Sequence, residues 1–231
     1  MILPPSNRFL LLWLAAYSVA MAFVESAVVV YLRNQWYPSG FAFPLVALDS
    51  HTVLTEILRE AATLVMLISV SFLAARTSLM RFAYFLFCFG LWDLFYYIFL
   101  KLLIGWPATL MDWDILFLIP VPWTGPVVAP CLLSLLMIAM ALLITRAAAL
   151  EILIKIPGRA WAMLGVGSMI VIFSFCMDYL LAWVAGRNME SYIPQNFPWW
   201  LFITGLAIII TGMLILFRMP GQKRFMNLTN T

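Results

Sequence analysis

Eight polar side chains that could bind a proton, a cation or a polar ligand occur within long apolar stretches of the sequence. An ionisable side chain is costly to place in a bilayer, so it usually faces a protein interior or a wet cavity and indicates function. The candidates are Glu25, Glu56, Arg59, Glu60, Asp93, Tyr97, Lys101 and Asp178. Their chemistry is that of an acidic ligand-binding or proton-binding site.

The spacing of these candidates places several of them on common helix faces. Glu56 and Glu60 are four residues apart, so they share one face of a helix. Arg59 can pair with Glu56 along that helix or reach Glu25 on a neighbouring one. A second stripe, with intervals of four residues, consists of Asp93, Tyr97 and Lys101.

The internal charges of these candidates do not balance. The candidates hold five carboxylates but only two cations, Arg59 and Lys101, which leaves a formal surplus of three negative charges if they cluster. Carboxylates packed together in a low dielectric require bound protons or a bound cation. No cofactor motif is evident, but a divalent cation would suit oxygen ligands, with Glu56 and Glu60 as weak metal candidates. The alternative is structural, with ion pairs and hydrogen bonds that only join helices.

The segment 105–125 adds four further candidates and has an unusual composition. It is apolar but too short to span a membrane, and Pro120 and Pro122 prevent a regular helix. It suits an aromatic belt at the membrane interface. It also suits a lid over an outward-facing cavity, because non-helical backbone at membrane depth must be packed in protein or line a wet cavity. The residues in question are Asp112, Trp113, Asp114 and Trp123.

The composition identifies the class of protein that must position these residues. Of the 231 residues, 65% are hydrophobic and 10% are charged, whereas soluble domains have about 45–50% apolar and about 25% charged residues. These values exclude a soluble globular enzyme, a disordered chain and a nucleic-acid-binding module. The single histidine and the three cysteines without a C-x-x-C pair exclude the usual multi-histidine metal centres and a redox dithiol.

We therefore predict an all-α, polytopic transmembrane helix bundle that forms one domain over residues 1–231. A membrane-spanning helix needs about 20 mostly apolar residues. Six stretches meet this requirement, near 9–32, 52–75, 81–104, 126–150, 160–185 and 198–217. The connecting loops on one side are 33–51, 105–125 and 186–197.

The distribution of charge predicts the orientation of the chain. With a cytoplasmic amino terminus, nine basic residues and one acidic residue fall on the cytoplasmic side, against four basic and nine acidic residues outside. Positive residues favour the cytoplasm, so we expect a multi-pass plasma (inner) membrane protein with both termini cytoplasmic. A cleaved signal peptide over residues 1–22 is the alternative, and it leaves the same loops outside.

Two stretches resemble known sequences. They are Glu25–Arg33 (ESAVVVYLR) and Trp92–Pro130, which contains WDLFYY, GWP, WDILFLIPVPW and GPVVAP. They are similar to a group of uncharacterised bacterial integral membrane proteins with six helices. The resemblance covers the first four apolar stretches. It implies a bacterial inner-membrane protein and carries no activity with it.

Three functions fit these observations. The favoured one is binding or transport of a small solute or ion at an outward-facing acidic site. The second is an intramembrane enzyme that acts on a lipid or isoprenoid, with Glu56, Glu60 and Asp93 as acid–base groups. The third is a non-catalytic subunit of a larger membrane complex. The expected partners are the lipid bilayer and either a second copy of the chain or another membrane protein, but no nucleic acid.

Overall fold

The six predicted helices are present. The computed structural model describes residues 5–119, 121–150, 157–188 and 191–218. Within these residues, six helices are long and apolar enough to cross a membrane, which confirms the predicted fold class. The helices are α1 (Pro5–Trp36), α2 (Ser50–Ala74), α3 (Ser78–Ile104), α4 (Val128–Ala149), α5 (Gly158–Val184) and α6 (Trp199–Arg218).

Local sequence signals set several helix boundaries. Asp49 caps α2, because its side chain accepts hydrogen bonds from the backbone N–H groups of His51 and Thr52. Thr77 caps α3 in the same way. Gly105 ends α3 with a φ of 70°, a left-handed conformation that glycine adopts without steric cost.

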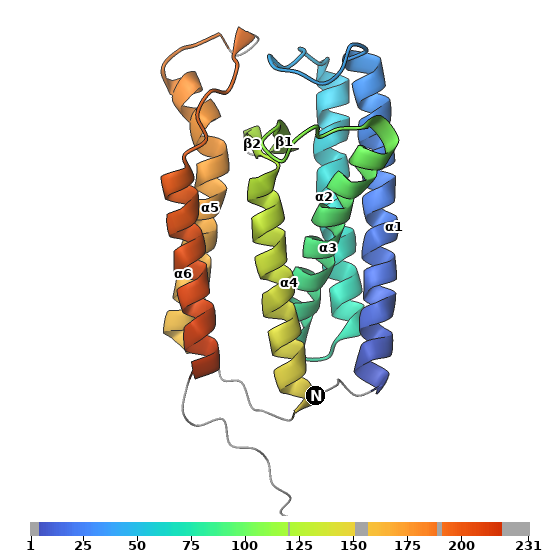
Figure 1. Ribbon diagram of the computed structural model, residues 1–231, viewed down its shortest axis with the longest axis vertical. Helices are drawn as coiled ribbons and strands as arrows, with labels where there is room; N and C mark the ends of the chain where they lie inside the picture. Colours follow the sequence, from blue (N-terminus) through green and yellow to red (C-terminus); the bar gives the residue numbers. More distant parts are fainter. Residues whose placement is uncertain (1–4, 120, 151–156, 189–190, 219–231) are drawn as a thin grey trace, which may run out of the picture.

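Successive helices run in opposite directions, so α1 begins and α6 ends at the same end of the bundle (Figure 1). The opposite end carries the loops 37–49, 105–127 and 185–198. We call it the hairpin end, because the loop 105–127 contains a β-hairpin.

The helices form two packing groups. In the first group, α1, α2 and α4 all pack on α3. In the second, α5 pairs with α6. A Cβ atom added to Gly167 of α5 would lie 2.9 Å from the carbonyl oxygen of Gly205 on α6, and the converse distance is also 2.9 Å. Such close backbone approach between small residues is a common way for membrane helices to associate.

The β-hairpin joins the two groups. Strands β1 (Trp113–Phe117) and β2 (Trp123–Pro126) pair antiparallel, with Asp114 opposite Gly125. The hairpin lies below the upper ends of α1, α2 and α5, between the two helix groups (Figure 1). The Trp123 ring stacks against Phe175 of α5, with 6.5 Å between ring centroids and 7° between planes. The sequence predicted a non-helical segment here but not its strands.

Candidate functional site

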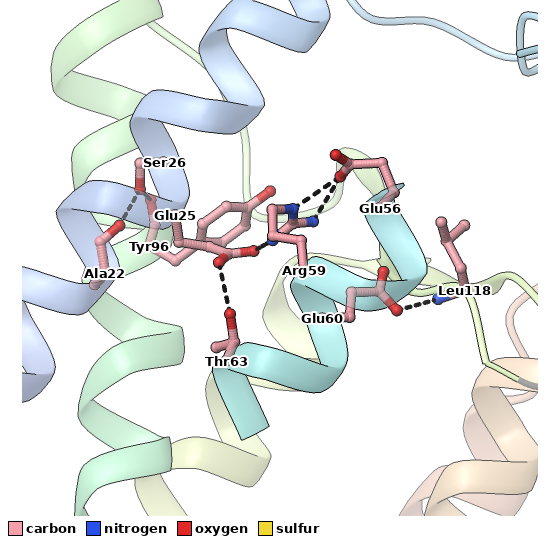
Figure 2. Close-up of polar contacts among 9 residues, drawn as sticks. All are labelled: Ala22, Glu25, Ser26, Glu56, Arg59, Glu60, Thr63, Tyr96 and Leu118. Carbon is pink, nitrogen blue, oxygen red and sulfur yellow. Dashed lines mark hydrogen bonds and ion pairs between the residues drawn. The ribbon is translucent and has the colours of Figure 1, made fainter. Parts of the chain in front are cut away.

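Arg59 of α2 lies at the centre of a charged cluster near the hairpin end (Figure 2). Its guanidinium donates to Glu25 of α1 and, with N···O distances of 2.8 Å, to Glu56 on its own helix. The second carboxylate oxygen of Glu25 accepts a hydrogen bond from Thr63 Oγ1 at 3.2 Å. One guanidinium therefore serves two carboxylates, and this triad keeps one negative charge.

Glu60 lies one residue after Arg59, but its side chain points elsewhere. Its carboxylate points toward the hairpin, where Oε2 accepts the backbone N–H of Leu118 at 3.0 Å (Figure 2). The side chain is buried, and the ion pairs found among the described residues do not include it. Glu60 is thus a second negative charge outside these ion pairs, although the neighbouring guanidinium of Arg59 attracts it without direct contact.

Asp93 of α3 is another buried carboxylate outside these ion pairs. Its Oδ2 accepts a hydrogen bond from Ser134 Oγ of α4 at 2.8 Å. Both residues are buried. As with Glu60, the ion pairs of the described residues do not include Asp93.

Arg33 and Asp114 form a buried ion pair at the edge of this region. Arg33 Nη2 of α1 lies 2.8 Å from Asp114 Oδ1 of β1. The same guanidinium lies over the rings of Trp106 and Phe41, 3.8 and 4.4 Å from their centroids. Burial raises the pKa of Asp114 to about 6, and the charge of Arg33 acts in the opposite direction.

Two adjacent cavities lie among these side chains. The outer cavity, of about 160 Å³, lies between α1, α2, the loop 37–49 and the hairpin, and it is bordered by Arg33, Glu56 and Asp114. The inner cavity, of about 60 Å³, is bordered by Glu25 and Asp93. Arg59, Glu60 and Tyr96 border both. A volume of roughly 10–15 Å³ holds one water molecule, so the inner cavity has room for a small hydrated ligand.

One residue in the wall of the inner cavity has a hydrogen-bond donor without a partner. Among the described residues, the indole N–H of Trp92 is buried and has no hydrogen-bond partner. Trp92 borders the inner cavity beside Asp93. Buried polar groups are almost always hydrogen-bonded to protein or water, so the Trp92 N–H is a candidate donor to a polar group in this cavity.

A third, much larger space is apolar. This apolar groove, of about 500 Å³, runs between α2, α3, α4, α5 and α6. Its lining is almost wholly hydrophobic, with Glu60 and Ser168 as the polar exceptions. Glu60 borders the apolar groove, the inner cavity and the outer cavity. It is therefore where the charged and the apolar spaces meet.

Six of the eight internal candidates lie together. Glu25, Glu56, Arg59, Glu60, Asp93 and Tyr97 all border the inner or outer cavity. The other two lie elsewhere. Lys101 is exposed, and its Nζ donates to the carbonyl oxygens of Gly105 and Pro107. The Asp178 carboxylate accepts a hydrogen bond from the Tyr192 hydroxyl at 2.8 Å.

The loop candidates have four different environments. Asp112 accepts hydrogen bonds from Ala108 and Thr109 within its own turn, and these bonds hold its pKa below the ordinary value against the opposing effect of burial. Trp113 contacts Phe197 edge-on. Trp123 lines the apolar groove. Asp114 alone joins the charged cluster.

Sequence reasoning missed Arg33 and Ser134. Arg33 follows Glu25 by eight residues, which is the same helix face, so this spacing could have indicated it. With Asp114 and Arg33 in place of Asp178 and Lys101, the cluster again has five carboxylates and two cations. The formal surplus of three negative charges is therefore the same, although its members differ.

No protein-family model, curated protein or solved structure matches the chain. Within the described residues, no three His, Cys, Asp or Glu side chains are grouped so as to hold a metal ion. A divalent cation at Glu56 and Glu60 stays a prediction.

Proposed function

We propose that this integral membrane protein binds a positively charged ligand, a small solute or an ion, in an acidic site embedded in the membrane. One observation carries the proposal. Glu60 and Asp93 are both buried, both border the inner cavity, and neither belongs to an ion pair among the described residues. A cation between them would supply the missing counter-charge.

The fixed cations of the cluster support this choice. Arg59 is committed to Glu25 and Glu56, and Arg33 is committed to Asp114. Breaking such ion pairs is unfavourable, so neither guanidinium leaves its partners to make a direct ion pair with Glu60 or Asp93. A mobile cation or bound protons would supply the remaining counter-charge.

The outer cavity gives the ligand a route from the hairpin end. It extends from loop residues Val46 and Leu48 down to Arg59 and Glu60, which also border the inner cavity. A ligand would therefore enter from the hairpin end and stop at Asp93. Release toward the opposite end would make the protein a transporter, and return along the same path would make it a receptor or sensor.

We propose that the hairpin end faces the cell exterior and that the membrane is a bacterial inner membrane. The support is charge: the described basic residues at the opposite end are Arg8, Arg76, Arg81, Arg146, Arg159 and Arg218. Positive residues at helix ends favour the cytoplasm. Five further charges used in the prediction, Glu151, Lys155, Glu190, Lys223 and Arg224, lie outside the described residues. Labelling of single cysteines in intact cells tests this orientation.

A binding experiment tests the proposed site. The purified protein is placed in lipid nanodiscs and titrated with methylammonium, Na⁺ and Mg²⁺, with calorimetry as the readout. We expect saturable binding of at least one of these cations, and a loss of tenfold or more in affinity in Glu60→Gln and in Asp93→Asn. Asp112→Asn is the matched control, because Asp112 lies in a turn and borders neither cavity.

Comparison of the wild type with the two cavity variants tests the proposed binding site. Equal affinity in the wild type, Glu60→Gln and Asp93→Asn would overturn the proposal, as would the absence of binding for all three cations. Uptake of the bound cation into proteoliposomes then separates a transporter from a receptor.

The apolar groove favours a second candidate, an intramembrane enzyme that acts on a lipid or isoprenoid. Glu60 borders both the groove and the acidic cavities, so a carboxylate could exchange protons with a chain-bearing substrate there. A change in membrane lipid composition on deletion of the gene, restored by the wild type but not by Glu60→Gln, would favour this candidate over simple binding.

A further inference from the structure

The apolar groove is an opening in the part of the chain that lies within the membrane. On α5 its lining runs from Leu164 to Ile172, which is about 12 Å along the helix at about 1.5 Å per residue. Ser168, midway along this stretch, is exposed. The groove therefore opens at the surface of the bundle, where the bilayer is the solvent.

The surroundings determine what can fill such a groove. A void lined by apolar side chains loses the dispersion contacts that a packed interior would have, and water gains too few hydrogen bonds in an apolar cavity to occupy it. The hydrocarbon chain of a lipid satisfies both requirements, and the bilayer supplies it at high concentration. An aromatic wall formed by Phe85, Phe89 and Phe117 follows one side of the groove.

The charge at one end of the groove determines which kind of lipid head group is favoured there. Glu60 borders the groove near the hairpin, and its Oε2 is held by the Leu118 N–H. Glu60 also borders the inner cavity, which carries the surplus negative charge. A chain lying in the groove would bring its head to this carboxylate, where a cationic head is favoured and an anionic head is repelled.

We propose that the groove binds the hydrocarbon chain of a long-chain amine, whose ammonium head is bound by Glu60 at the mouth of the inner cavity. This inference rests on the proposed function and names its ligand class: a cationic amphiphile drawn from the bilayer. The chain supplies affinity through burial of apolar surface, and Glu60 and Asp93 supply selection for positive charge.

A series of ligands with one chain and different heads tests the proposal. Hexadecylamine, hexadecanol and hexadecanoic acid compete in nanodiscs with a hexadecylamine that carries bromine on its chain. Bromine quenches the fluorescence of nearby indoles, and Trp123 lines the groove. Binding of the brominated probe is therefore measured as the part of the quenching that is lost in Trp123→Phe. We expect hexadecylamine to displace the probe at a concentration at least tenfold lower than hexadecanoic acid does, and Glu60→Gln to abolish that difference.

Two variants on neighbouring positions of α4 test the groove itself. Leu136→Trp adds volume inside it, whereas Leu135→Trp adds the same volume on an exposed face outside it. We expect Leu136→Trp to weaken hexadecylamine by tenfold or more and to leave methylammonium, which has no chain, unchanged. Leu135→Trp should change neither. Ser168→Phe, which fills the groove from α5, provides a second variant should Leu136→Trp fail to fold.

The outcomes separate this inference from the proposed function. If methylammonium binds through Glu60 but hexadecylamine binds no more tightly, the acidic site stands and the amphiphile is wrong. If hexadecanoic acid competes as well as hexadecylamine, the groove holds chains without selection by charge, and the inference is also wrong. A dimer that Leu136→Trp dissociates would show that a second copy of the chain fills the groove instead.

Discussion

The guanidinium of Arg33 and the carboxylate of Asp114 lie 2.8 Å apart, although the two residues are separated by 81 positions in the sequence. This buried pair fixes the β-hairpin to the hairpin end of α1. The hairpin in turn supplies the Leu118 N–H that holds Glu60. The orientation of Glu60 therefore depends on an ion pair that Glu60 does not join.

Removal of one member of this pair should be strongly destabilising. Asp114→Ala removes the oxygen that accepts the hydrogen bond of the buried Arg33 guanidinium, whereas protonation of Asp114 keeps that oxygen in place. A buried group left without its partner costs about 1–3 kcal/mol, and more where it is charged. Thermal unfolding in detergent measures the effect, with Asp112→Ala as the control for a loop aspartate whose side chain accepts hydrogen bonds from Ala108 and Thr109 in its own turn. An unfolding temperature in Asp114→Ala as high as in the control would show that the pair does not hold the hairpin.

The same pair should respond to pH. The pKa of Asp114 is raised to about 6 by burial, so the folded protein binds this proton more tightly than the unfolded chain does. Stability therefore falls as the pH rises from about 4, the ordinary value, to about 6, and then levels off. Below about pH 6 the pair loses its negative partner, and the emission of Trp106, on which Arg33 stacks, should change.

The fluorescence titration has two controls. Asp114→Asn should lack the transition with a midpoint near 6, and Trp106→Phe identifies the indole responsible. His51→Gln removes the single histidine of the chain, so that its ring makes no contribution. A transition that persists unchanged in Asp114→Asn would assign it to another group.

Asp93 should lose its function when its hydrogen-bond donor is removed. Ser134→Ala deletes the hydroxyl that binds Asp93 Oδ2, and a hydrogen bond to a charged group contributes about 1.5–3 kcal/mol. The ionised carboxylate becomes less favourable, so cation binding at neutral pH should weaken by tenfold or more. Ser174→Ala is the control, since that buried hydroxyl bonds only to the Val171 carbonyl on its own helix. Equal affinities in the two variants would exclude Ser134 as a positioning residue.

The crossing of α5 and α6 should not tolerate a methyl group. In Gly167→Ala the new Cβ would lie 2.7 Å from Ile209 Cγ1 and 2.9 Å from the Gly205 carbonyl oxygen, and overpacking of this kind costs about 1–3 kcal/mol. Gly165→Ala on the same helix meets nothing within 4 Å and should leave the unfolding temperature unchanged or raise it. Equal stability of the two variants would mean that the helices do not meet at Gly167.

The helices and the centre of the site could be predicted from sequence because they depend on residues that are close together in the chain. Long apolar runs specify membrane helices, and the interval from Glu56 to Glu60 specifies a shared face whatever the helices pack against. The pairing of Arg59 with Glu56 follows from their three-residue interval on one helix. The pairing of Arg59 with Glu25 was the other contact that the sequence offered.

The remaining features depend on packing between distant segments, which one sequence does not reveal. Arg33 could equally have been an exposed residue at a helix end, and its contacts with Asp114, Phe41 and Trp106 are what bury it. Asp178 lies on α5, whose orientation about its own axis determines that it meets Tyr192 rather than the charged cluster. The apolar groove corresponds to no motif at all, since it results from the separation of α5 and α6 from α2 and α3.

The glycine contact between α5 and α6 has a mechanical consequence. Two helices that touch backbone to backbone move together as one rigid arm. This arm meets the rest of the bundle at the hairpin, where Trp123 stacks on Phe175, and near the opposite end, where Trp161 contacts Phe82. A swing of this arm would widen or narrow the apolar groove. The cavities around Arg59 are walled by α1, α2, α3, the loop 37–49 and the hairpin, so the swing would reach them through the hairpin that Trp123 joins to α5. Lateral pressure in the bilayer would thus act directly on the width of the groove that holds the chain, and through the hairpin on the cavities that hold the charge.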